Sequence, residues 1–304
     1  MSPHRPDPAT ARDDAHRPGA PVCGCAWHGR RLFTGLLASG MAAPALAAIP
    51  ECKRSNFARA VPAEQIEQSA QQQYRQMLVQ AQSQRGLAPP THAQVQRLRT
   101  IAERIIPFAP ECNPRAGQWR WEVNLIGSPE INAFCMPGGK IAFYYGILAK
   151  LQLSDDEVAV IMGHEVAHAL LEHAREQVGK NTLTQTGLRL GAALLGLGDL
   201  GNMAAQIGAQ LLSLTYSRSD ESEADALGLV MSARAGYRPQ AGVTLWQKMV
   251  AASGGKTPPK LLSTHPAGDD RIRDLQARMD RVQPLYEAAD KPSRVFGPPP
   301  LLKG

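Results

Sequence analysis

The stretch that decides the fold of this chain runs from Ser154 to Ala174 and reads SDDEVAVIMGHEVAHALLEHA. It predicts a helix, because Ser154 is a favourable N-cap residue and Glu157, three positions later, completes a capping box. Apolar residues recur around the helix, at Val158, Ile161, Met162, Val166, Ala167, Leu170 and Leu171. We therefore expect this helix to be buried. Ionisable side chains on a buried helix need a partner, because an unpaired charge is costly in the core.

Those ionisable side chains are His164, Glu165 and His168. Histidines four residues apart stand on the same helix face, where both imidazoles can bind one Zn²⁺ at about 2.0–2.1 Å. Glu165 lies about 100° further round the helix, close enough to reach a water on the metal without being a ligand. A five-residue pattern also arises by chance, but its position on a capped, apolar helix favours a zinc site of hydrolytic type.

A third protein ligand has to come from elsewhere in the sequence. His173 follows His168 by five residues, which turns it about 140° away on an ideal helix. We therefore interpret His173 as an exposed or second-face histidine. Ala174 stands where the metzincin pattern would place its third histidine, and no glycine breaks the helix before it.

A better source of the third ligand is the segment 217–225, SRSDESEAD. Ser217 or Ser219 can cap a helix there, which puts Glu221 and Asp225 on one face. One of these carboxylates can bind metal while the other orients a ligating imidazole. An acidic first turn that complements the helix dipole is the alternative, and spacing alone leaves Glu223 open as the ligand.

The remaining sequence predicts an α+β fold that is predominantly helical. Helical periodicity covers 62–85 and 91–106, and an alternating strand pattern covers 119–125. Pro137-Gly138-Gly139 separates two β-prone runs within 131–145, which predicts a hairpin, and so a small β-sheet, beside the histidine helix. Residues 183–214 are rich in Leu, Gly and Ala. They favour two packed linking helices, with a lid or a peripheral membrane contact as the alternative.

The two ends of the chain differ in composition from the predicted catalytic domain at 49–287. In 1–48, Arg30-Arg31 precede a short apolar run and a small-residue cleavage pattern at 45–48. This predicts an export signal, of twin-arginine type or an ordinary secretory one, and a periplasmic mature protein. The Pro- and Gly-rich tail at 288–304 predicts disorder.

Cysteine usage and charge agree with an exported protein that does not bind nucleic acid. Cys52 and Cys112 both lie in Pro-Glu-Cys contexts and can form one disulfide in an oxidising compartment, whereas Cys135 is predicted to be a buried small hydrophobe. The formal net charge is +6, but no block of Lys and Arg suggests a nucleic-acid groove.

Four motifs together resemble the HtpX-like and CAAX prenyl endopeptidase family of zinc metallopeptidases, in particular its soluble periplasmic YggG-like and BepA-like branch. The first two are the HExxH pentapeptide beginning at His164 and the ExxxD string from Glu221 to Asp225, preceded by Ser217-Arg218. The others are 131–141, INAFCMPGGKI, and 263–272, which contains His265 and Arg271-Ile272. The resemblance covers roughly residues 70–285.

The resemblance implies a gluzincin core in which Glu221 is the third zinc ligand and Glu165 the catalytic base. It also implies that Asp225 supports a ligand histidine, and we place Arg218 among the residues that surround the ligands. Polypeptides, especially misfolded envelope proteins, are the implied substrates. The chain lacks the family's multiple membrane spans and has no room for the tetratricopeptide domain of the BepA-like branch, so prenyl-protein processing is not implied.

The predicted chemistry is metal-assisted peptide hydrolysis, in which Glu165 takes a proton from water and passes it to the leaving amine. The strand after Gly139 is predicted to pair with an extended substrate. His265 precedes a proline and so favours a loop, from which it serves as a fourth ligand of a resting state or as an oxyanion donor. The rival functions are a zinc-bound, non-proteolytic chaperone or assembly factor that uses the same cleft, and a purely structural zinc site.

Overall fold

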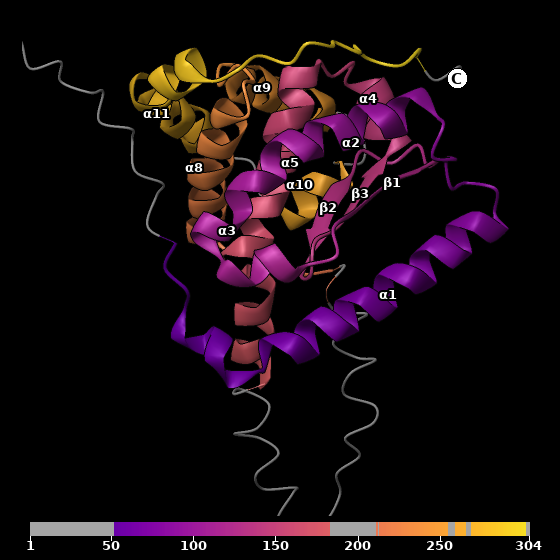
Figure 1. The fold of residues 1–304 in the computed structure, drawn as a ribbon, viewed down its shortest axis with the longest axis vertical. Coiled ribbons are helices and arrows are strands. Elements are labelled where there is room, and N and C mark those ends of the chain that lie inside the picture. The colour runs from indigo at the N-terminus through magenta and orange to yellow at the C-terminus, as the bar shows by residue number, and fades with distance from the viewer. Residues whose placement is uncertain (1–51, 183–210, 212, 255–258, 266–268, 302–304) are drawn as a thin grey trace, which may run out of the picture. The chain divides into compact units, whose positions relative to one another are not determined.

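The computed structural model describes residues 52–182, 211, 213–254, 259–265 and 269–301 (Figure 1). The predicted export signal and most of the 183–214 segment lie outside these residues. Within them, no helix combines the length and the apolar character needed to cross a membrane.

The described elements are mostly helices, with three short strands. In chain order they are η1 Asn56–Ala60, α1 Ala63–Ser83, α2 Ala93–Ile105, η2 Ile106–Phe108, α3 Ala109–Cys112, η3 Pro114–Gln118, β1 Glu122–Ile126, β2 Ala133–Met136, β3 Lys140–Tyr144, α4 Tyr145–Lys150, α5 Asp155–Leu170, a helical stretch at 173–182, α8 Arg218–Arg234, α9 Ala241–Ser253, α10 Lys260–Thr264 and α11 Asp269–Ala288. The prediction of a predominantly helical α+β fold is confirmed.

The sheet has the strand order β1-β3-β2, with β1 parallel to β3 and β2 antiparallel to β3. The predicted hairpin is confirmed. Its turn requires glycine, since Gly138 and Gly139 have φ of 82° and 75°. Strand β3 is central and both its edges are paired, so our prediction that it would pair with substrate is wrong. Strands β1 and β2 are the two edge strands of this sheet.

Strand β1 starts later than the alternating pattern predicted. The indole N–H groups of Trp119 and Trp121 donate to Glu67 on α1 and to the carbonyl of Ala116, at 3.0 and 3.1 Å. These side chains therefore anchor the turn that leads into the strand and do not belong to it.

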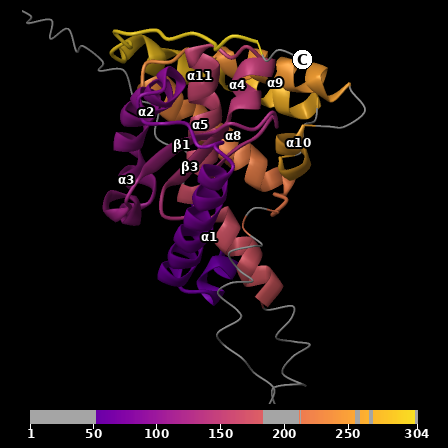
Figure 2. The same cartoon turned by 90° about the vertical axis from the view of Figure 1, so that its right-hand side faces the viewer.

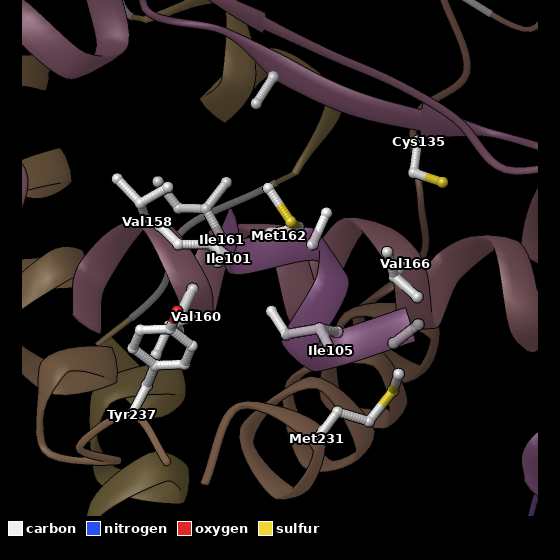
Figure 3. Close-up of a cluster of buried hydrophobic side chains, with 14 of the residues drawn as sticks. Ile101, Ile105, Cys135, Val158, Val160, Ile161, Met162, Val166, Met231 and Tyr237 are labelled. Atoms are coloured by element: carbon white, nitrogen blue, oxygen red, sulfur yellow. The ribbon is translucent and has the colours of Figure 1, made fainter. Parts of the chain in front are cut away.

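Helix α5 lies between the sheet and α8 (Figure 1), and its capping box forms as predicted. Apolar side chains from α2, β2 and α8 surround it, among them Ile101, Ile105, Cys135 and Met231 (Figure 3). All residues of α5 except Asp156 are buried. The expectation of a buried helix is therefore confirmed.

The crossing of α5 and α8 depends on two glycines. A Cβ on Gly228 would lie 2.6 Å from the backbone nitrogen of His164, and a Cβ on Gly163 would lie 2.6 Å from the carbonyl oxygen of Gly228. Real Cβ atoms do not approach backbone so closely. The absence of side chains therefore lets the two helices meet backbone to backbone, one residue from His164.

The chain after α5 turns sharply before the helical stretch at 173–182. Glu172 has a left-handed φ of 61°, which stops α5 and redirects the backbone. The stretch then lies beside the start of α1 (Figure 2), where Arg175 donates to the carbonyl of Val61 at 2.7 Å.

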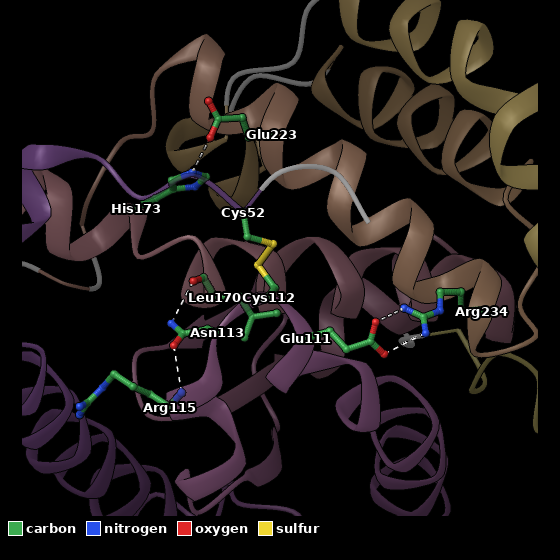
Figure 4. The surroundings of a disulfide bond; sticks show 9 residues. All are labelled: Cys52, Glu111, Cys112, Asn113, Arg115, Leu170, His173, Glu223 and Arg234. Carbon is green, nitrogen blue, oxygen red and sulfur yellow. Dashed lines mark hydrogen bonds and ion pairs between the residues drawn. A yellow bond between two sulfur atoms is a disulfide. The ribbon is translucent and has the colours of Figure 1, made fainter. Parts of the chain in front are cut away.

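Two contacts join residues that are far apart in the sequence: a disulfide near the start of the described residues and hydrogen bonds near their end. Cys52 and Cys112 form a disulfide across 60 residues (Figure 4), whereas Cys135 is free and buried. As far as Leu301, the tail does not follow the prediction of disorder. The backbone N–H groups of Phe296 and Gly297 donate hydrogen bonds to the carboxylate of Asp155 at 2.8 and 3.2 Å. The amino-acid composition of the tail could not show that Asp155 accepts hydrogen bonds from the tail's backbone N–H groups.

Candidate metal centre

Helix α5 positions the first group of candidate residues. His164 and His168 lie one turn apart on it, and their Nε2 atoms are 3.0 Å from each other. Both imidazoles and the carboxylate of Glu165 are buried, with exposed fractions of 6% or less. The two Nε2 atoms therefore face each other, within reach of one metal ion bound between them.

Helix α8 brings the second group. Ser217 caps it with Asp220 in a capping box, so the alternative cap Ser219 is not used. The close crossing at Gly228 carries Glu221 to His168, with Oε1 3.4 Å from Nε2. The acidic turn therefore does more than complement the helix dipole, because Glu221 is 3% exposed and faces the histidines.

The turn after α10 supplies the third group. Nδ1 of His265 lies 2.9 Å from Oε1 of Glu221 and 3.3 Å from Nε2 of His164. Its other nitrogen, Nε2, lies 3.6 Å from Oε1 of Glu165. His265 is thus inserted between the predicted ligands and the predicted base.

The donor atoms fit a tetrahedral zinc ion. Four ligands at about 2.0–2.1 Å from such an ion lie about 3.4 Å apart. His164, His168, Glu221 and His265 each offer one atom to a set within 4.8 Å of one another, and the contacts given above span 2.9–3.4 Å. Oε1 of Glu165 is buried without a hydrogen-bond partner, as expected of a group that acts on a further molecule.

The carboxylate of Asp225 orients His164, with Oδ1 3.0 Å from Nδ1. This contact leaves Nε2 of His164 for the metal. The position matches our prediction of a carboxylate that holds a ligand histidine.

Arg271 is a further residue of the site to which the sequence analysis gave no role. Its Nε and Nη2 donate to Asp225 at 2.6 and 2.8 Å, and its Nη1 forms an ion pair with Glu221. The guanidinium also lies over the ring of Trp246, 3.6 Å from the centroid. The motif around His265 contained Arg271, but only the packing of α11 on α8 shows that it bridges both carboxylates.

For three residues, the position in the structure differs from a prediction or from an alternative that the sequence analysis left open. Arg218 is exposed at the start of α8 and stands outside the cluster, so its predicted place beside the ligands is wrong. Glu223, left open as a ligand, faces His173 with Oε2 3.6 Å from Nε2. His173 is 2% exposed, not solvent-facing, because the turn at Glu172 breaks the ideal helix geometry on which that prediction rested.

The electrostatics of the cluster favour a neutral imidazole and an ionised ligand carboxylate. Burial lowers the pKa of His168 well below its ordinary value. Burial alone would raise the pKa of Glu221, but hydrogen bonds with His168 and His265 outweigh it and lower that pKa. Burial raises the pKa of Glu165, which suits a carboxylate that must accept and return a proton.

A groove of about 260 Å³ leads along β2 to the metal cluster. The edge strand forms one side, and Leu211, Leu214 and Tyr216 lie across from it. Glu165 and His265 line the same groove. A ligand in the groove would therefore contact the edge strand and the candidate base together.

Comparison with known proteins agrees with this site. The profile of peptidase family M48 matches residues 92–279, which contain the whole cluster. Mitochondrial metalloendopeptidase OMA1 of Schizosaccharomyces pombe is 36% identical over 174 residues, covering 56% of this chain and 50% of the relative. The same-named protein of Saccharomyces cerevisiae is 30% identical over 221 residues, covering 69% and 63%.

A bacterial relative covers a similar part of the chain. The beta-barrel assembly-enhancing protease of Escherichia coli (strain K12) is 30% identical over 171 residues, covering 53% of this chain and 35% of the relative. The chain thus spans less than two thirds of the length of these three relatives. Because the family profile covers most of the chain and all four residues of the cluster, this chain belongs to peptidase family M48.

Proposed function

We propose that this chain is a zinc-dependent endopeptidase that hydrolyses extended polypeptides. The observation that carries the proposal is the convergence of His164, His168 and Glu221 beside Glu165, whose buried Oε1 has no hydrogen-bond partner among the described residues. A purely structural zinc site has no use for that carboxylate. The membership of the chain in a peptidase family supports the same activity.

The residues divide the chemistry among them. A zinc ion held by His164, His168 and Glu221 supplies Lewis-acid polarisation of the scissile carbonyl and activation of water. Glu165 accepts a proton from the attacking water at Oε1 and delivers it to the leaving amine. Burial favours the first of these transfers, because the raised pKa of Glu165 makes its carboxylate a stronger proton acceptor.

The substrate is proposed to bind as an added strand on β2. An edge strand offers unpaired backbone groups, and pairing through the backbone tolerates many sequences. Strand β2 has this position in the sheet, and the groove along it reaches Glu165. This assignment replaces β3, whose two edges are already paired.

We propose that His265 closes the site in the resting enzyme. Its Nδ1 lies among the ligand atoms and its Nε2 faces Glu165, so it fills the place that water needs. Hydrolysis then requires that His265 leave this position. His265→Ala is expected to raise the basal peptidase rate, whereas a sharp fall with retained zinc would assign it the alternative role of oxyanion donor.

The central experiment compares wild type with Glu165→Gln on an unfolded protein substrate. The amide keeps the size of the side chain but cannot accept the proton, so hydrolysis should fall by about 10²–10⁴-fold. Zinc content by elemental analysis should stay at one per chain. If wild type and Glu165→Gln both lack hydrolysis yet both suppress aggregation, the chaperone alternative is correct.

The proposed setting is the periplasm, where misfolded envelope proteins are the substrates and one face of the enzyme contacts the membrane peripherally. The Cys52–Cys112 disulfide supports an oxidising compartment, and the bacterial relative is named for assembly of β-barrel proteins. Amino-terminal sequencing of protein from fractionated cells tests this. A mature end near Ala48 in the periplasmic fraction is expected, and an intact Met1 in the cytoplasm would contradict it.

A further inference from the structure

Two ionisable residues beside the metal cluster take no part in the chemistry proposed above. His173 is 2% exposed, and its Nδ1 lies 2.9 Å from Nδ1 of His168. On its other side, Nε2 of His173 faces Oε2 of Glu223 at 3.6 Å (Figure 4). His168, His173 and Glu223 therefore form a chain that leads from the cluster toward the surface.

The positions of the protons along this chain follow from the two distances. Nε2 of His168 points into the cluster, toward His164 and Glu221, so it must present a lone pair if it is to bind metal. The proton of neutral His168 then lies on Nδ1. Because Nδ1 of His173 is 2.9 Å away, it must accept that proton's hydrogen bond, and its own proton lies on Nε2, toward the carboxylate of Glu223.

The backbone holds His173 in place by contacts that do not involve the metal ligands. The amide of Asn113 donates to the carbonyl of Leu170, the last residue of α5, at 3.1 Å. Glu172 then takes its left-handed conformation and accepts from Arg175 at 2.7 Å. His173 follows directly, so these two contacts fix the turn that carries it; Asn113, Leu170 and His173 are drawn in Figure 4.

The other ligand histidine on α5 is oriented in an equivalent way. Oδ1 of Asp225 lies 3.0 Å from Nδ1 of His164 and accepts its proton. Among the described residues His168 has no carboxylate in this position, and the imidazole of His173 stands there instead. Each ligand histidine thus has one acceptor at Nδ1, which leaves Nε2 of both directed at the same point.

We propose that His173 is a positioning residue that holds His168 in its Nε2-binding tautomer, with the carboxylate of Glu223 facing Nε2 of His173 at 3.6 Å. The inference rests on the proposed zinc site and assigns its outer partner on the His168 side. Partners of this kind typically change metal affinity by 10–100-fold. His173 touches neither substrate nor reacting atoms, so its effect should appear in metal binding before catalysis.

The test compares two substitutions of His173 that differ in the acceptor. His173→Asn can place its amide oxygen near the position of Nδ1, whereas His173→Leu has similar bulk and no acceptor. Zinc dissociation constants are measured by competition with a chromogenic chelator. We expect about 10–100-fold weaker binding for the Leu variant and binding within about threefold of wild type for the Asn variant.

A second measurement keeps the inference testable if the Leu variant does not fold, or if the wild type proves to bind no zinc. Nitrogen-15 NMR of zinc-free, histidine-labelled wild type reports the tautomer of His168 directly. The Nδ1–H form should dominate in wild type and in His173→Asn. A dominant Nε2–H form in wild type overturns the inference, as does zinc binding by His173→Leu within threefold of wild type or an equal loss in both variants.

Discussion

Replacing Gly228 with alanine should damage the metal site through the crossing of α5 and α8. The added Cβ would lie 2.6 Å from the nitrogen of His164 and 2.7 Å from the carbonyl carbon of Gly163. Both contacts are with backbone, so no side chain can rotate away. The helices must therefore separate, and the separation acts directly beside a proposed ligand.

The size of the effect follows from the geometry. Ordinary contacts begin at 3.4 Å, so a contact of 2.6 Å demands a shift of 0.8 Å. Overpacking of this kind costs about 1–3 kcal/mol, of which the better helix propensity of alanine returns up to about 1 kcal/mol. The net expectation is a loss of about 1–2 kcal/mol of unfolding free energy, although helix propensity alone predicts a gain. Since Glu221 moves with α8, zinc affinity should fall as well.

The assay is urea unfolding of the zinc-free protein together with zinc titration. Gly242→Ala is the matched control, because the nearest contact of its Cβ is a side-chain methyl of Leu229 at 3.4 Å. This control should be neutral or more stable by up to about 1 kcal/mol. If Gly228→Ala matches Gly242→Ala in stability and binds zinc as wild type does, the reasoning about the crossing is refuted.

Three further predictions concern the cysteines and the acidic turn. Replacing Cys52 and Cys112 with serine should cost about 4 kcal/mol of unfolding free energy in urea, from the entropy of a loop of about 60 residues; a loss below about 1 kcal/mol would contradict this. Cys135 should resist iodoacetamide at pH 8 until the protein is denatured, because burial raises the pKa of its thiol well above the ordinary value; rapid labelling of the native chain, seen by peptide mass spectrometry, would count against it. Glu221→Ala should weaken zinc binding more than about a hundredfold and Glu223→Ala far less, as chelator competition can measure; the reverse order would move the ligand to Glu223.

Several elements were predictable because their signals are local. The capping box at Ser154 and Glu157, the i, i+4 histidines and the Gly138-Gly139 turn depend only on residues a few positions apart. The same holds for the helix that begins after Ser217. In each case the backbone geometry of one element fixes the relation between the residues, so the pattern carries the structure.

The errors arose where a prediction extended local geometry past the end of an element. His173 was placed by ideal helix rotation, but a left-handed residue at Glu172 redirects the chain. Strand β3 was predicted to pair with substrate, but the sequence of a hairpin does not show which of its two strands a third strand joins. The tail was read from composition, which does not register that Asp155 accepts its backbone N–H groups.

The sequence by itself determined that two histidines and a glutamate share a buried helix and that an acidic helix start follows downstream. It did not determine which acid meets the histidines, because Glu221 and Glu223 differ only by a rotation about α8. The tertiary crossing at Gly163 and Gly228 decided between them. The packing of α11 on α8 brought Arg271 to Glu221 and Asp225. Contacts between elements depend on where helices approach each other, and no local sequence pattern encodes that approach.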